Sequence, residues 1–142
     1  MSDYKDYIDK GIEEIHSGKF EDAIADITKS IELKNDWEIS YFYRAVANQA
    51  LEKWDDAMLD YTKALQINDK MPDAYYNKAK ITLSRKDIEN PDIKKAISDL
   101  EKALELDDKL HYLQWLLRTK NLVNITNHLN IWKDCLRLNR KQ

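Results

Sequence analysis

The chain has 142 residues, enough for one domain or one short array with its own hydrophobic core. Only two glycines and two prolines occur, and Ala, Leu, Lys and Glu are abundant, which favours an all-α protein over one built from β-hairpins. The net charge of −3 does not favour a general binder of nucleic acid, and the single cysteine, Cys135, excludes an internal disulfide framework.

The N-terminal sequence MSDYKDYIDK has no apolar run of signal-peptide length, and no later stretch is long and apolar enough to span a membrane. A cytoplasmic protein without membrane association is therefore expected. The apolar residues that follow recur at helical spacing and predict a first helix over about residues 3–17, which ends before Gly18.

One phrase then occurs three times. KFEDAIADITKSIELKN (residues 19–35) is echoed by KWDDAMLDYTKALQIND (53–69) and by DIKKAISDLEKALELDD (92–108), at offsets of 34 and 39 residues. Each copy has Ala fifth, Asp eighth and Lys eleventh: Ala23, Ala57 and Ala96; Asp26, Asp60 and Asp99; Lys29, Lys63 and Lys102. A fixed period of this size is typical of helical-repeat proteins.

Each phrase has the spacing of an amphipathic helix, and a second helix is expected before each one, over about residues 3–17, 36–52 and 72–85. These preceding segments share a small residue at one place: Gly11, Ala45 and Ala79. Two antiparallel helices approach closely only where side chains are small, so these residues and the fifth-position alanines should mark the crossing. The Asp and Lys of each phrase, three residues apart, are expected on the outer face as a helix ion pair.

These features resemble the tetratricopeptide repeat (TPR), a helix–turn–helix unit. The matching residues are Tyr7, Gly11, Phe20, Ala23 and Ser30; Tyr41, Ala45, Trp54, Ala57 and Ala64; and Tyr75, Ala79, Ile93, Ala96 and Ala103. The resemblance covers about residues 4–108 and implies a right-handed array with repeats at about 4–37, 38–71 and 72–110, within a single domain over residues 1–142.

The third repeat has five extra residues, which fall most simply at 87–92. Asn90 followed by Pro91 predicts a helix cap with Pro at the first helical position. The insertion is either a plain extension of the turn or a functional loop, and the sequence leaves both open.

Residues 111–142 do not repeat the phrase, but their apolar pattern predicts a degenerate fourth pair or capping helices. Residues 110–142 carry a charge of +5, whereas residues 1–109 carry −8. Trp115 and Trp132 either close the end of the array or form an interface, so self-association through the C-terminal helices is an alternative.

No catalytic constellation is evident. His16, His111 and His128 lack the spacing of metal ligands, Cys135 is expected as a small apolar core residue, and there is no glycine-rich phosphate loop. The basic C-terminal residues form no stripe along successive repeats, which does not favour nucleic acid. The sequence predicts a protein that is not an enzyme and holds no cofactor or metal.

In the resembled family, the first helices of successive repeats line a concave surface that takes a peptide. The resemblance therefore implies an apolar and aromatic peptide-binding groove formed by Ile8, Ile12, Phe42, Tyr43, Val46, Tyr76 and Asn77. One subset of the family clamps the carboxylate of chaperone tails with Lys, Asn and Arg. The equivalent places here hold Ile8, Ile12, Tyr43, Asp73 and Asn77, so no such clamp is expected.

The predicted function is a non-catalytic module that binds a peptide or a partner helix. Two alternatives stay open at this stage. Phe42 and Ile12 could instead pack between repeats or be covered by the C-terminal segment, and the chain could be a structural protein that self-associates.

Overall fold

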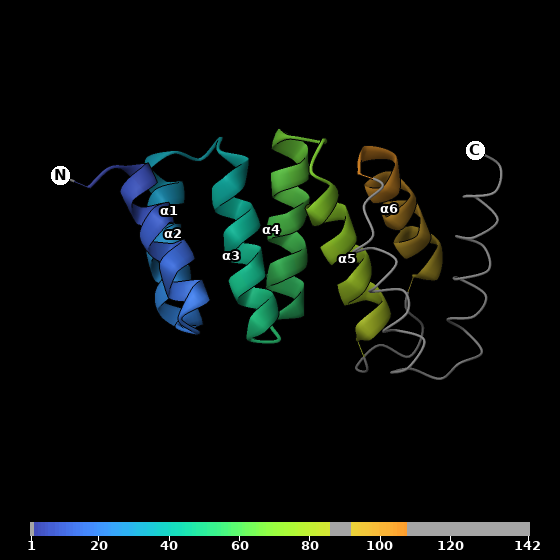
Figure 1. Cartoon of the computed structure of the whole chain (residues 1–142), viewed down its shortest axis with the longest axis horizontal. Coiled ribbons are helices and arrows are strands. Elements are labelled where there is room, and N and C mark those ends of the chain that lie inside the picture. The colour runs from blue at the N-terminus through green and yellow to red at the C-terminus, as the bar shows by residue number, and fades with distance from the viewer. Residues whose placement is uncertain (1, 86–91, 108–142) are drawn as a thin grey trace. The chain divides into compact units, whose positions relative to one another are not determined.

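Six α-helices form the part of the chain that this computed structural model describes, residues 2–85 and 92–107 (Figure 1). The chain divides into two compact units, Met1–Ala74 and Tyr75–Gln142. The first unit contains α1 (Tyr4–His16), α2 (Phe20–Leu33), α3 (Glu38–Ala50) and α4 (Trp54–Ile67). Helix α5 (Pro72–Ser84) begins in the last residues of the first unit and continues into the second, and α6 (Ile93–Leu106) lies in the second unit.

The predicted all-α class is confirmed, and no strand occurs within the described ranges. Each copy of the repeated phrase forms one helix, α2, α4 or α6, and each is preceded by a second helix, α1, α3 or α5. The predicted helical pair at 111–142 and the interface alternatives at Trp115 and Trp132 lie outside the described residues. The same holds for residues 87–91 of the insertion predicted at 87–92.

Two helix starts are fixed by side-chain caps. Asp3 accepts hydrogen bonds from the backbone N–H groups of Lys5 and Asp6, while Asp6 accepts one from the N–H of Asp3, which completes a capping box before α1. The predicted cap at Asn90 is wrong: α6 begins at Ile93, and Asp92 caps it by accepting from the N–H of Lys95. An aspartate oxygen two residues later satisfies the free N–H groups of the first turn equally well.

In the first unit, α1 packs on α2, α3 packs on α4, and α2 packs on α3, with a smaller contact between α1 and α3. The predicted small residues at the crossings are all buried: Gly11, Ala45, Ala79, Ala23, Ala57 and Ala96. A Cβ placed on Gly11 would lie 2.5 Å from Cγ1 of Ile27, so the approach of α1 to α2 requires glycine at that position. The structure thus shows all six small residues buried and places Gly11 at the crossing of α1 and α2.

A pair of buried hydroxyl groups connects the first helical pair to the second. Oγ of Ser30 in α2 lies 2.8 Å from the backbone oxygen of Tyr4 and 2.9 Å from Oγ of Ser40 in α3. Because a serine has one hydroxyl hydrogen and Ser30 donates it to Tyr4, Ser40 is the donor to Ser30. Both side chains are fully buried, so the hydroxyl of Ser40 depends on Ser30 as its acceptor, whereas Ser30 also has the backbone oxygen of Tyr4.

The turns after α1 and α3 have the same hydrogen bonds but different residues at the left-handed position. The N–H groups of Gly18 and Lys19 bond the carbonyls of Ile15 and Glu14, and those of Glu52 and Lys53 repeat the pattern one period later. This is the Schellman motif, which needs a positive φ at its central residue. Gly18 has a φ of 75°, and Glu52 has a φ of 59° although it is not glycine.

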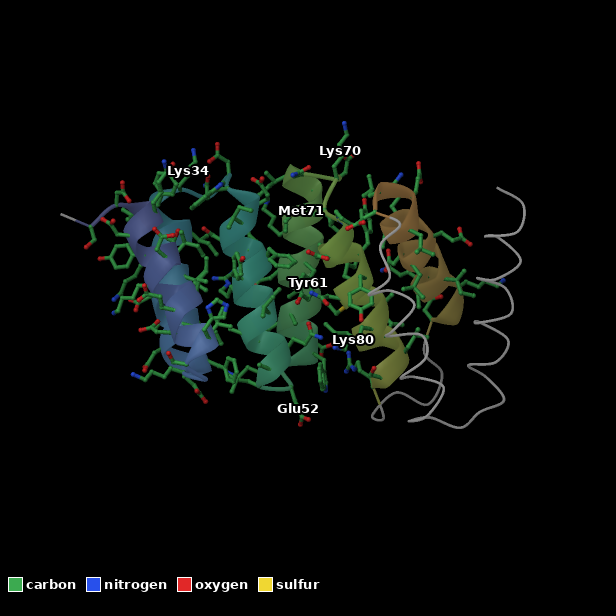
Figure 2. The ribbon with its side chains drawn as sticks, in the orientation of Figure 1. Lys34, Glu52, Tyr61, Lys70, Met71 and Lys80 are labelled. Carbon is green, nitrogen blue, oxygen red and sulfur yellow. The ribbon has the colours of Figure 1, made fainter. Side chains whose placement is uncertain are left out.

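Glu52→Gly is expected to raise the free energy of unfolding by about 0.5–1 kcal/mol, because an L-residue is strained in the left-handed region. Glu52 is exposed, and Figure 2 shows its side chain pointing away from the helices, so no contact is lost with it. Chemical denaturation measures the change. Gly18→Ala is the matched control and should lower stability by a similar amount, since an added Cβ there meets nothing within 4 Å and only φ matters. A destabilised Glu52→Gly variant would contradict the strain at this turn.

Candidate functional site

The first-unit residues of the predicted peptide-binding set lie on α1 and α3, but not all of them reach the surface. Ile8 is only 1% exposed and forms a core cluster with Ala23, Ile27 and Ala47. Ile8 therefore has no surface to offer a peptide, and its inclusion in the predicted site does not fit the structure. The physical reason is that its position on α1 faces α2 and α3, where Gly11 allows close packing.

The other four residues, Ile12, Phe42, Tyr43 and Val46, are half-buried. Ile12 and Tyr43 pack against the same core cluster from α1 and from α3. The ring of Phe42 meets that of Tyr43 edge to face at a centroid distance of 5.3 Å, and it meets that of Tyr61 in α4 at 5.7 Å. These side chains thus contribute to the fold and still leave part of their apolar surface to solvent or to a partner.

Tyr61 of α4 packs against the ring of Phe42. The side chain of Tyr61 is labelled in Figure 2. Its ring is fully buried, and its hydroxyl lies 2.7 Å from Oε1 of Gln49, to which it donates. The buried ring of Tyr61 therefore gives Phe42 an aromatic packing surface on α4. The remaining predicted contacts, Tyr76 and Asn77, belong to α5 in the second unit, where both are half-buried and both take part in interactions.

The aspartates at the eighth position of the repeated phrase are buried, so their predicted place on an outer face is wrong. Asp26 is 5% exposed, Asp60 is 7% exposed and Asp99 is 9% exposed. Nζ of Lys10 in α1 lies 2.7 Å from Oδ2 of Asp26, while the predicted ion pair with Lys29 is present at 3.4 Å. In the third copy, Lys102 pairs with Glu105.

In the second copy of the phrase, Asp60 and its cation belong to a network of four hydrogen bonds between side chains of α2, α3 and α4. Arg44 in α3 donates from Nε and Nη2 to the two carboxylate oxygens of Asp60 in α4, at 2.8 and 2.9 Å. Nδ2 of Asn48 donates to the same carboxylate at 3.4 Å, and Nη1 of Arg44 reaches the hydroxyl of Thr28 in α2 at 3.2 Å. The bidentate pair joins the two helices of one repeat, and the Thr28 contact extends it to the repeat before.

In the second unit the equivalent residues are Lys78 in α5 and Asp99 in α6, both of which are buried. Burial lowers the pKa of Lys78, and burial raises the pKa of Asp99, while each charge partly offsets the effect on the other. Oδ2 of Asp99 has no hydrogen-bond partner within the described residues. This pair is therefore less well satisfied than the pair formed by Arg44 and Asp60.

The cations of this network were missed at the sequence level, although a signal for them exists. Lys10, Arg44 and Lys78 recur at a fixed offset of 34 residues, each directly before the small residue of its first helix. A cation and an aspartate that recur together on the two helices of every repeat indicate an ion pair between those helices. Spacing within a single helix cannot reveal that pairing.

Glu14 occupies in the first repeat the place that Asn48 occupies in the second. Its side chain is 15% exposed and lies 3.7 Å from Nζ of Lys10, but its second oxygen is buried and has no partner within the described residues. Burial, followed by the nearby negative charge of Asp26, raises the pKa of Glu14. The hydrogen bond from Lys10 lowers the pKa of Asp26. The pKa of Glu14 is therefore raised while that of the neighbouring Asp26 is lowered.

Glu14→Gln is expected to raise the free energy of unfolding by about 1 kcal/mol at neutral pH, because an amide can donate toward Asp26 where a carboxylate cannot. Since the pKa of Glu14 is raised in the folded state, its stabilising effect falls as the pH rises from the ordinary glutamate value through the raised one. The advantage of the variant should therefore disappear toward acidic pH. Urea denaturation across a pH series tests this, and a pH-independent difference would contradict it.

No group of three or more His, Cys, Asp or Glu residues placed to hold a metal ion occurs among the residues that the structure describes. In the same residues, no helix has the length and apolar character needed to cross a membrane.

Solved structures with the same arrangement of helices are known. The first TPR of Spaghetti (RPAP3) bound to the HSP90 peptide SRMEEVD is 23% identical, with a TM-score of 0.74 over 89% of this chain and 93% of that chain. The Arabidopsis OM64 TPR domain is 23% identical, with a TM-score of 0.72 over 84% of this chain and 96% of that chain. The Yersinia enterocolitica type III secretion chaperone SycD, in complex with a peptide of the translocator YopD, is 19% identical, with a TM-score of 0.69 over 87% and 90% of the two chains.

No family model matches the sequence, and no curated protein matches it. At these low identities, the likeness to solved structures concerns the fold alone. The paired helices, the small residues at their crossings and the structural likeness agree with one another. The chain therefore has the fold of the tetratricopeptide repeat.

Proposed function

We propose that the chain is a non-catalytic protein-interaction module that binds a peptide or a partner helix on the side of α1 and α3 where Ile12, Phe42, Tyr43 and Val46 are half-exposed. The observation that carries this proposal is the edge-to-face pair of Phe42 and Tyr43, in which Phe42 also packs against the buried ring of Tyr61. Rigid aromatic side chains that are partly exposed lose little conformational entropy on binding, and such residues are common anchors in protein interfaces.

The structural neighbours support an interaction role in general terms. The Spaghetti domain was solved with a peptide of HSP90, and SycD was solved with a peptide of YopD. We extend the shared activity, peptide binding, to this chain but not the ligands. A chaperone-tail carboxylate is not the proposed ligand, because the places expected to hold cationic clamp residues include the apolar Ile8 and Ile12, and Ile8 is buried. Tyr76 and Asn77 remain predicted contacts, and a cytoplasmic location remains a prediction.

Phe42→Ala is expected to weaken binding of the native partner by about 2 kcal/mol, or roughly 30-fold, if Phe42 is an anchor. The partner is first captured from a lysate of the source organism with the unmodified chain, and its affinity for both chains is then measured by titration calorimetry. Leu59→Ala is the matched control, because Leu59 on α4 is 69% exposed and lies outside the proposed site. Chemical denaturation of each variant separates lost binding from lost folding.

The rival function, self-association through the C-terminal helices, predicts a different result. Light scattering over a concentration series should show a monomer if the chain is an interaction module. Concentration-dependent dimers, together with unchanged partner binding by Phe42→Ala, would reject the proposed function.

A further inference from the structure

A ridge of acidic side chains runs along the exposed side of α1. Asp9 and Glu13 are four residues apart and solvent-exposed, and Asp6 continues the ridge toward the N-terminus of the helix, where it takes part in the capping box. Like charges three and four residues apart lie on one helix face and repel each other. Neither Asp9 nor Glu13 has an ion pair within the described residues.

Several other acids of the first unit are paired with cations. Asp26 binds Lys10 and Lys29, Asp60 binds Arg44, and Asp36 lies 3.2 Å from Lys34. Two cations of α1 lie near the ridge by helical spacing. Lys10, three residues before Glu13, is bound to Asp26 and Glu14, and the ammonium group of Lys5, four residues before Asp9, lies over the ring of Tyr4, 5.9 Å from the centroid. The acidic ridge is thus left without a positive partner among the described residues.

The wider charge of this unit reinforces the ridge. Residues 1–74 contain 9 Lys and Arg against 17 Asp and Glu, a net charge of −8. A field of that sign attracts positively charged partners and repels acidic ones over about one Debye length, roughly 10 Å at moderate salt. An acidic tail peptide would therefore meet an unfavourable potential here, whereas a basic peptide would meet a favourable one.

The ridge lies beside the apolar surface proposed for binding. Three residues of an α-helix turn through about 300°, so Asp9 stands only about 60° around α1 from Ile12. Ile12 packs against the same core cluster as Tyr43 of α3, and Tyr43 contacts Phe42. Asp9 is therefore a neighbour of the half-exposed Ile12 on α1, and Tyr43 of α3 packs against the same cluster as Ile12.

We propose that the partner is a basic amphipathic peptide or helix. Its apolar side chains contact Ile12, Phe42 and Tyr43, and its Lys or Arg side chains lie against Asp9 and Glu13. This inference rests on the proposed function and adds to it the chemistry of the partner. A cation placed between Asp9 and Glu13 relieves their mutual repulsion, and the apolar contacts fix the orientation of the peptide.

Two synthetic amphipathic helices with the same leucine pattern test the proposal, one with Lys and the other with Glu on its polar face. Fluorescence anisotropy with the full chain should show binding of the Lys peptide, weakened by added salt, and no binding of the Glu peptide. Asp9→Asn/Glu13→Gln should weaken binding of the Lys peptide by about fivefold to tenfold, because two exposed ion pairs are lost.

The matched control is Asp56→Asn/Glu32→Gln, which makes the same chemical changes at exposed positions on α4 and α2 and alters the net charge equally. If this control weakens binding as much as the α1 variant does, general attraction explains the result and the proposal is overturned. Equal binding of the Glu peptide overturns it as well. Salt-sensitive dimers of the full chain that Asp9→Asn/Glu13→Gln dissociates would also overturn it, since a second copy would then be the occupant.

Failure of this inference can be distinguished from failure of the proposed function. If Phe42→Ala weakens both peptides and the α1 charge variant weakens neither, the interaction module stands and the basic partner is wrong. If the charge variant weakens the Lys peptide while Phe42→Ala has no effect, the apolar face is wrong and so is the proposal built on it.

Discussion

Asp60→Ala is expected to lower the free energy of unfolding by about 3 kcal/mol, because it leaves a partly buried guanidinium without its carboxylate. Arg44 would lose both of its hydrogen bonds to Asp60, and Asn48 would lose its acceptor. The side chain of Arg44 is 23% exposed, so water can reach it in part and keep the loss at the lower end for buried pairs. Urea denaturation monitored by circular dichroism measures the change.

Two controls separate the lost ion pair from other effects. Asp56→Asn, at an exposed position one turn earlier on α4, should change stability by less than about 0.5 kcal/mol. The double variant Arg44→Met/Asp60→Leu removes both charges and should recover most of the stability lost by Asp60→Ala, since an apolar pair needs no partner charge. If the double variant is as unstable as Asp60→Ala, packing and not charge explains the loss.

Gly11→Leu is expected to lower the free energy of unfolding by about 3 kcal/mol, because the crossing of α1 and α2 has no room for a side chain. A Cβ alone would meet Cγ1 of Ile27 at 2.5 Å, and Ile27 is itself fully buried, so it cannot move into solvent. Thermal and urea denaturation measure the loss. At the equivalent crossing of α3 and α4, Ala57→Leu should cost about 1–3 kcal/mol, less than at Gly11 because alanine already has a Cβ.

Ala25→Leu serves as the control for this prediction. Ala25 is exposed on α2, and leucine is nearly as good a helix former as alanine, so stability should change by less than about 0.5 kcal/mol. A small effect at Gly11 would mean that α1 and α2 can separate slightly to admit a side chain. In that case, the close approach would not hold the pair together.

The helices could be predicted from the sequence because the repeated phrase shows the same pattern three times. Ala23, Ala57 and Ala96 recur at one position of the phrase and are all buried. Close packing of paired helices requires a small side chain at the same position of each repeat. Local signals were less certain. Asn90 followed by Pro91 has the pattern of a helix start, but Asp92 caps α6. Asn90 and Asp92 are both good capping residues and are only two positions apart, so the sequence pattern did not distinguish them.

The candidate site was harder to predict because exposure depends on neighbouring helices. Ile8 and Ile12 are one helical turn apart on α1 and look equivalent in the sequence, yet Ile8 is buried among residues of α2 and α3 while Ile12 is half-exposed. Asp26 and Asp60 looked like surface charges because Lys29 and Lys63 follow three residues later. Their main partners, Lys10 and Arg44, come from a different helix, 16 residues earlier in each repeat.

The pair of serine hydroxyls has a consequence for lengthening the chain by duplicating residues 38–71. In such a tandem, the second copy of Arg44 would meet Thr62 in place of Thr28, so the arginine contact across the junction would be preserved. The second copy of Ser40 would meet Ala64 in place of Ser30 and would lose its acceptor. An engineered concatemer would therefore need Ala64→Ser in its leading copy. That hydroxyl would give the second copy of Ser40 a hydrogen-bond acceptor at the new junction.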